Sequence, residues 1–360
     1  MKQSRYGSEH WWAMRSMVRI SVAAAVCLMG VPPATAQDDV PTVPEENELG
    51  LPGIPYLKLA RPELGVLTDD TRALATELRR DVEMLATDIG PRGTFAPERY
   101  ALAADFLMAS LKKAGYEPRK IAVECHLGPS FNIEALLPGT EHPERVIVIG
   151  AHYDSVEGCP AANDNASGVA GVLAMARALR EAPHAYTIRF MLYANEEPPH
   201  FNFNGMGSQI DAASCRKAGM DIRAMFCLET IGCYRAEKKS QTWPNDVLAA
   251  VLPSTGDFIA FVGMEGSKPA VRACAEAFTR TGAFPLLAAS VPPAIQMAMW
   301  SDHRGYDEAG YPAFMVTDTA PLRYPHYHKA TDTAEKLDYD SMARVVEGLI
   351  GMMRDGEMRP

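Results

Sequence analysis

Histidine and carboxylate side chains stand where the predicted strands of this 360-residue sequence end. The set is His152, Asp154, Glu196, Glu197, Glu229 and His328, and Asp164 precedes a predicted helix. Open α/β sheets bind ligands in the crevice at the carboxyl ends of their strands, so we expect these side chains to meet in one place. Because these side chains come from separate segments and are expected to meet, they indicate a catalytic or ligand-binding site.

The types of these side chains point to metal chemistry. Two histidines with several carboxylates suit zinc, manganese or cobalt better than magnesium or copper, and zinc is the first choice. Two ions about 4 Å apart, bridged by a carboxylate, can acidify a water and stabilise an oxyanion. A free carboxylate beside them could move the proton. Successive strand residues point to opposite sides, so Glu196 and Glu197 could divide the proton and metal tasks.

Each of these residues also has a plain structural explanation. His152 and Asp154 could form a solvated pair at a strand end, and Asp164 could be a helix N-cap. Glu196-Glu197 could be an exposed acidic turn. The occurrence of all of them at the ends of separate strands favours the functional interpretation.

The elements that would position these residues alternate along the chain. Strands are predicted at 119–124, 132–137, 145–151, 187–194, 222–228, 258–262 and 313–317. Helices are predicted at 71–87, 100–114, 169–179, 269–280 and 341–353. The alternation predicts one α/β domain over 70–354, with a central, mostly parallel mixed β-sheet flanked by helices.

The N-terminal region differs in composition from this domain. Basic residues, a short apolar run and Ala34-Thr35-Ala36 make residues 1–36 typical of a cleaved signal peptide. The apolar run is too short to span a bilayer, so we expect no stable membrane anchor. Residues 37–69 are rich in proline and predict an extended lead-in or propeptide with little chemistry. The protein is therefore expected to be exported, either periplasmic or secreted.

Charge and cysteine content limit the partners. After removal of residues 1–36 the chain would carry 31 basic and 44 acidic residues, a balance of −13. Nucleic-acid binding needs a basic face, so nucleic acid is not an expected partner. Six cysteines remain, which permits disulfides in an exported chain, and no pairing follows from the sequence. The absence of a Cys-x-x-Cys pair argues against a cysteine zinc knuckle.

With these residues in view, the chain resembles the co-catalytic zinc exopeptidases of metallopeptidase family twenty-eight, which includes bacterial aminopeptidases and glutamate carboxypeptidases. The resemblance runs from Ile89-Gly90-Pro91-Arg92 to the closing helix. Its motifs are Gly150-Ala151-His152-Tyr153-Asp154-Ser155, Asn163-Asp164-Asn165-Ala166-Ser167-Gly168, Ala194-Asn195-Glu196-Glu197, Leu228-Glu229-Thr230-Ile231-Gly232 and His328-x-x-x-Asp332-Thr333. Such a set in this order is specific to the family.

The resemblance implies two zinc ions per chain and metal-dependent hydrolysis of peptide bonds, with removal of N-terminal residues as the expected activity. Asp164 would bridge the two ions. Glu197 and His328 would complete one site, and His152 and Glu229 the other. The expected partner is a peptide substrate.

Further roles are implied in the same way. Glu196 would be the general base, and Asp154 would orient the ring of His152. Tyr327 is placed like a tyrosine that steadies the oxyanion in some relatives. The family pattern also predicts a cis peptide between Asp164 and Asn165.

Some positions depart from the pattern or leave a choice. Glu229 stands where many relatives carry aspartate, so the reach of this ligand changes. His326 could compete with His328, which we favour for its spacing to Asp332-Thr333. Ser301-Asp302-His303 resembles a family motif that usually lies behind the ligands and supports them, and His303 could act directly in catalysis or could pack in the core. Loop 198–206, rich in Phe and Asn, is expected to line the mouth of the pocket.

Three other classes of protein compete with the peptidase interpretation. A serine hydrolase is disfavoured because no Gly-x-Ser-x-Gly occurs. A glutaminyl-peptide cyclotransferase would share the fold and use a single zinc, but its relatives carry tryptophan where Tyr327 stands. A non-catalytic binding relative is disfavoured because all five ligand positions and Glu196 keep competent chemistry. The sequence leaves open the residue specificity and the choice between amino- and carboxypeptidase.

Overall fold

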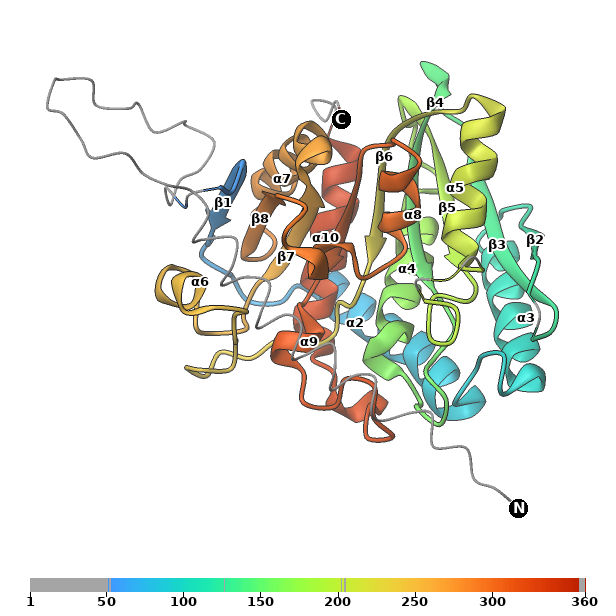
Figure 1. Cartoon of the computed structure of the whole chain (residues 1–360), viewed down its shortest axis with the longest axis horizontal. Coiled ribbons are helices and arrows are strands. Elements are labelled where there is room, and N and C mark those ends of the chain that lie inside the picture. Colours follow the sequence, from blue (N-terminus) through green and yellow to red (C-terminus); the bar gives the residue numbers. More distant parts are fainter. Residues whose placement is uncertain (1–50, 52, 126, 202, 204, 356–359) are drawn as a thin grey trace, which may run out of the picture.

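The computed structural model describes residues 51, 53–125, 127–201, 203, 205–355 and 360. The predicted signal peptide and the first part of the lead-in lie outside these residues. The described chain forms one nine-stranded sheet with helices on both faces (Figure 1). The predicted fold class, an α/β domain with a central mixed sheet, is confirmed.

The sheet brings together strands from distant parts of the chain. Its order is β1 (Tyr56–Ala60), β8 (Leu286–Val291), β7 (Ile259–Met264), β9 (Ala313–Thr317), β6 (Asp221–Leu228), β4 (His142–His152), β5 (Tyr186–Tyr193), β3 (Ser130–Leu137) and β2 (Arg119–Val123). The four strands β9, β6, β4 and β5 run parallel to one another, and β7 pairs with β8 in parallel. Antiparallel pairs join β1 to β8, β7 to β9, β5 to β3 and β3 to β2. The parallel centre places the carboxyl ends of four strands at one edge.

Alternation along the central strands builds a core on each face. In β4, Ile147 and Ile149 belong to the larger core, whereas Val146 and Val148 belong to the smaller one. The larger core is covered by α2 (Asp69–Glu83), α3 (Pro97–Lys113), α4 (Gly168–Leu179), α7 (Lys268–Thr281) and α10 (Tyr339–Arg354). The opposite face is covered by α5 (Gly207–Ala218) and α8 (His303–Glu308), which lie in front of the sheet in Figure 1.

Short elements complete the fold. They are α6 (Asp246–Val251), α9 (Ala320–Arg323), the π-helical turns η1 (Met84–Ile89) and η2 (Ala162–Ser167), and the 3₁₀ turns η3 (Glu265–Ser267), η4 (Gln296–Met299) and η5 (Ala334–Lys336). Two of the longer helices begin at side-chain caps that the sequence supplies: Thr68 accepts the N–H of Thr71 before α2, and Asp338 accepts that of Ser341 before α10.

Two strands and four helices are present that the sequence pattern did not predict. They are β1, β8, α5, α6, α8 and α9. β1 lies within the 37–69 segment that we expected to be an extended lead-in, and it forms one end of the sheet (Figure 1). Five residues are too few to show a clear period, and β1 is stabilised by its pairing with β8. Part of the lead-in is therefore built into the sheet.

Three further expectations can be checked here. The peptide between Asp164 and Asn165 is cis, as predicted. The six cysteines after residue 36 are all free, so the disulfides that the sequence permits are not formed in this structure. Within the described ranges, no helix is long and apolar enough to cross a membrane.

Candidate metal centre

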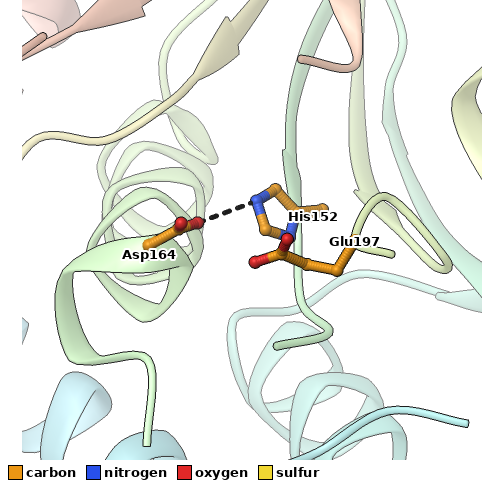
Figure 2. Close-up of side chains that lie close together, drawn as sticks. All are labelled: His152, Asp164 and Glu197. Atoms are coloured by element: carbon orange, nitrogen blue, oxygen red, sulfur yellow. Dashed lines mark ion pairs between the residues drawn. The ribbon is translucent and has the colours of Figure 1, made fainter. Parts of the chain in front are cut away.

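The candidate metal ligands come from the edge of the sheet where the parallel strands end. His152 is the last residue of β4, Glu197 follows β5, and Glu229 follows β6 directly. Asp164 lies in η2, the turn that leads into α4, and His328 lies in the loop after α9. Figure 2 shows His152 at its strand end, with its ring turned toward Asp164 and the side chain of Glu197 close to it. The predicted convergence is therefore present.

Asp164 lies between the two histidines and turns one oxygen toward each. Its Oδ1 is 3.3 Å from Nε2 of His152, the contact dashed in Figure 2. Its Oδ2 is 2.8 Å from Nε2 of His328. This is the arrangement that a bridging carboxylate needs, because each oxygen can bind a different ion.

The remaining carboxylates divide between the same two histidines. Glu229 Oε2 lies 3.0 Å from Nε2 of His152, and Glu197 Oε2 lies 3.4 Å from Nε2 of His328. The extra methylene of Glu229 thus does not keep it from the cluster. Ligand atoms of His152, Asp164 and Glu197 all lie within 4.8 Å of one another. The five side chains form two adjoining groups that share Asp164.

Several buried polar atoms of this cluster make no hydrogen bond. His152 is fully buried and Asp164 is 2% exposed. Among the described residues, both ring nitrogens of His152, both oxygens of Asp164 and Oε1 of Glu197 make no hydrogen bond, although charged groups lie nearby. Buried polar atoms are nearly always satisfied, so such a group of exceptions needs an explanation. Nitrogen and oxygen donors facing a common centre fit zinc.

The charges of the cluster also favour a bound cation. Burial, together with the negative charges of Glu197 and Glu229, raises the pKa of Glu196 well above its usual range. Burial likewise raises the pKa values of Glu197 and Glu229. Although burial opposes it, the carboxylates around His152 raise the pKa of its ring well above the usual value. A cation would relieve this excess of negative charge.

Asp154 holds the backbone of the acidic pair. Its Oδ1 accepts the N–H of Glu196 and its Oδ2 that of Glu197, each at 3.1 Å. Oδ1 also lies 3.4 Å from Nδ1 of His152, the side of the ring that faces away from Asp164. Asp154 therefore contacts three of the residues that would do the chemistry, as a supporting carboxylate should.

Other residues also hold the candidate ligands in place. Asn165 donates to Oε2 of Glu229 at 3.1 Å, and Ser301 donates to the same oxygen at 3.0 Å. Asp332 accepts the backbone N–H of Asp164 at 3.1 Å. Asn165 and Asp332 lie inside the quoted motifs, so their positions could have signalled a supporting role. Ser301 belongs to the Ser301-Asp302-His303 motif, for which the resemblance implies a supporting role, and its contact with Glu229 fits that role.

A small cavity opens over the cluster. Its volume is about 390 Å³, and its lining residues are Asp164, Glu196, Glu197, Pro198, Phe201, Glu229, Trp300, Tyr327 and His328. Glu196 Oε2 lies 3.9 Å from Nε2 of His152, so it faces the cluster. Pro198 and Phe201 belong to the loop that was expected at the mouth of the pocket, and that expectation is confirmed for them.

The structure shows which of Tyr327, His326 and His303 lie at the cavity. The ring of Tyr327 stacks on that of His328, with centroids 3.9 Å apart, and lines the cavity. His326 instead pairs with Thr331 Oγ1 at 2.9 Å. His303 is fully buried, with its ring nitrogens near Ala298 O and Cys227 Sγ, and burial lowers its pKa to about 4. His303 therefore belongs to the packing and does not line the cavity.

Comparison with known sequences identifies relatives of this chain. The profile described as Peptidase family M28 matches residues 132–353. An uncharacterized protein of Escherichia coli K12, YfbL, is 33% identical over 309 residues, covering 83% of this chain and 94% of that protein. A protein of Trichophyton verrucosum described as a probable leucine aminopeptidase is 27% identical, covering 70% of this chain and 66% of its own length.

Solved structures share the fold at low sequence identity. LapB from Legionella pneumophila superposes with a TM-score of 0.61 at 20% identity, covering 85% of this chain and 77% of that one. A glutaminyl cyclase of Porphyromonas gingivalis reaches 0.59, also at 20% identity, covering 79% and 97%. The fold alone therefore does not separate the two activities. The match of the family profile to more than half of the sequence, and the cluster that its motifs build, show that the chain belongs to peptidase family M28 and is a zinc metallopeptidase.

Proposed function

We propose that this metallopeptidase is an aminopeptidase that works with two zinc ions. The observation that carries the proposal is the position of Asp164, whose two oxygens face two separate pairs of ligands. His152 and Glu229 would hold one ion, Glu197 and His328 the other, and Asp164 both. The bound ions would supply an activated water and charge stabilisation for the oxyanion.

The lining of the small cavity favours a free amino terminus over a free carboxyl terminus. Four of its nine lining residues are acidic, and none is Lys or Arg. Two bound zinc ions would balance the charges of these four carboxylates, and the carboxyl terminus of a substrate would have no Lys or Arg side chain to pair with. The leucine aminopeptidase description of the fungal relative agrees with this preference.

Three side chains of this chain would carry out the remaining steps. Glu196 faces the cluster and would accept the proton of the attacking water and later deliver it to the leaving amine. Tyr327, which lines the cavity, would donate its O–H to the oxyanion. Burial raises the pKa of Tyr327 well above its usual value, so its hydroxyl stays protonated and able to donate. Asp154 would keep Glu196 in place through its backbone N–H.

The proposal includes export to the periplasm or the medium, with cleavage after Ala36 and a catalytic domain over 70–354. The sequence pattern of residues 1–36 supports the cleavage. Intact-mass measurement on protein recovered from the periplasm or medium would test it. A chain that begins at Gln37 is expected, and a chain that retains residues 1–36 would contradict it.

The test of the function compares the wild type with Glu196→Gln for metal content and for turnover of aminoacyl-p-nitroanilides. The wild type is expected to hold about two zinc ions and to cleave. Glu196→Gln should keep its metal and lose about 10²- to 10⁴-fold in kcat, the range that general acid–base groups contribute. Glu181→Gln makes the same chemical change at an exposed residue and should behave like the wild type.

Two results would overturn the proposal. A wild type that holds one zinc and cyclises an N-terminal glutamine without cleaving any aminoacyl substrate would be a glutaminyl cyclotransferase. A Glu196→Gln variant with full turnover would remove Glu196 from the mechanism.

A further inference from the structure

The fourth parallel strand of the sheet also ends at a carboxylate. It is Asp318, which directly follows β9 at the edge where the other parallel strands lead to candidate metal ligands. Asp318 is fully buried and is not among the described residues that line the small cavity. Unlike Asp164, it has hydrogen-bond donors on both of its oxygens. Asp318 is therefore placed to support the candidate ligands rather than to bind a metal itself.

Most of these donors belong to the segment that follows Glu229. Oδ1 of Asp318 accepts the hydroxyl of Thr230 at 2.6 Å. Oδ2 accepts the backbone N–H groups of Gly232 at 3.1 Å and Cys233 at 2.7 Å. In return, the backbone N–H of Asp318 donates to the carbonyl of Thr230 at 2.6 Å. These contacts attach the segment to the end of β9, directly beside the ligand that it carries.

The same carboxylate also reaches the turn that carries Asp164. Nδ2 of Asn163 donates to Oδ2 of Asp318 and to Oγ1 of Thr230, each at 3.0 Å. The two segments lie close together here, because a Cβ on Gly232 would lie only 2.6 Å from Oδ1 of Asn163. Asp318 therefore fixes the segment after β6 against the turn in which Asp164 lies.

The turn has a second attachment that does not involve Asp318. Asp332 accepts the backbone N–H of Asn163 at 2.8 Å and that of Asp164 at 3.1 Å. The turn keeps these two hydrogen bonds when Asp318 is replaced. The segment after Glu229, in contrast, donates three hydrogen bonds to the side chain of Asp318 itself. Replacement of Asp318 should therefore displace Glu229 more than Asp164.

We propose that Asp318 is a positioning residue that sets the affinity of the zinc ion held by Glu229 and has little effect on the ion held by Glu197. The inference rests on the proposed two-ion function. It divides the support of the metal centre between two buried aspartates. Asp332 acts on the bridging ligand and hence on both ions, whereas Asp318 acts on one.

Asp318→Asn tests the inference in two backgrounds, each of which lacks a ligand to one ion. Glu197→Ala leaves the ion of Glu229, and there Asp318→Asn should lower zinc affinity by about 10- to 100-fold, the usual effect of losing a supporting partner. Glu229→Ala leaves the other ion, and there the same change should alter the affinity by no more than about twofold, the usual limit for sites that act independently. Competition with a chromophoric chelator measures each affinity. Asp88→Asn, at an exposed position, is the control and should change neither affinity.

Thr230 supplies a second test in case Asp318→Asn does not fold. Thr230→Val removes the hydroxyl that donates to Asp318 and keeps the shape of the side chain, so it should weaken the ion of Glu229 by about tenfold. Thr230→Ser keeps the hydroxyl and should retain the wild-type affinity. A defect of packing alone would give the opposite order, because serine lacks the methyl group that valine keeps.

The outcomes separate this inference from the proposed function. Equal effects of Asp318→Asn in the two backgrounds, or a larger loss of affinity in Thr230→Ser than in Thr230→Val, would overturn the inference. The proposed function would survive either result if the wild type binds two zinc ions and cleaves aminoacyl-p-nitroanilides. A wild type that binds one ion would count against the proposed function, and the inference would then stand only if Asp318→Asn weakened that ion and Asp88→Asn did not.

Discussion

The carboxylate of Asp332 accepts the backbone N–H of Asp164 at 3.1 Å, across 168 positions of sequence. Its other oxygen accepts the N–H of Asn163 at 2.8 Å and the hydroxyl of Tyr324 at 2.8 Å. One fully buried side chain thus fixes the turn from which Asp164 reaches both histidines. The position of the proposed bridging ligand depends on a residue that would touch neither metal.

Replacing Asp332 should therefore weaken metal binding without removing a ligand. Asp332→Asn exchanges an acceptor oxygen for an amide that cannot accept, so the turn around Asp164 loosens. We expect zinc affinity to fall by about 10- to 100-fold, the usual effect of losing a supporting partner. Competition with a chromophoric chelator measures this affinity. Asp340→Asn, at an exposed position close in sequence, is the control, and equal affinities in the two variants would contradict the prediction.

The two neighbouring histidines should behave differently. His328 Nε2 lies 2.8 Å from Asp164 and 3.4 Å from Glu197, so His328→Ala should lose about one of the two proposed ions. His326 contacts Thr331, so His326→Ala should keep the full metal content. Elemental analysis of the two purified variants measures the difference. A larger metal loss in His326→Ala would reverse the assignment of the ligand.

Metal removal should destabilise the fold. The cluster buries several carboxylates whose raised pKa values reflect burial and mutual repulsion. A ligand at about 1,000 times its dissociation constant stabilises the folded state by about 4 kcal/mol. Dialysis against a chelator should therefore lower the midpoint of thermal unfolding by at least about 5 °C, and added zinc should restore it. Identical midpoints in calorimetry, with and without metal, would show that the cluster folds equally well without metal.

A buried ion pair away from the metal centre should produce an acid-dependent loss of stability. Glu134 of β3 is 2% exposed and pairs with Arg189 and Arg119. Burial opposes its charge, but the two guanidinium groups lower the pKa of its carboxyl below the usual value. A lowered folded-state pKa stabilises the protein above the unfolded-state pKa of about 4.3, and this contribution disappears as the pH falls below it.

The test compares Glu134→Gln with the wild type by urea unfolding at neutral and acid pH. At pH 7 the variant should be less stable by about 3 kcal/mol, because it leaves Arg189 with one fewer anion in the core. The difference should shrink below about pH 4.3. Glu117→Gln, at an exposed position, should show no such trend. A constant difference between Glu134→Gln and the wild type at every pH would mean that packing, and not charge, is the cause.

The sequence alone determined much of the site because its signals are local. His152, Glu197 and Glu229 follow apolar runs that are long enough to identify as strands, and parallel strands present their carboxyl ends at one edge. The fold class follows from the same alternation. The choice of His328 over His326 rested on its spacing to Asp332, and the geometry around Asp164 agrees with it.

Tertiary structure decided what depends on contacts between distant segments. β1 is held as a strand at the edge of the sheet by its pairing with β8, and β8 pairs in turn with β7. Ile54 lines a cavity with Trp300 because the pairing of β1 with β8 brings the N-terminal segment to that end of the sheet. His303 was open to a catalytic role until packing placed its ring against Ala298 and Cys227. The local pattern identifies which residues can do the chemistry, whereas the cavities around them depend on strand pairing and burial, which no local pattern records.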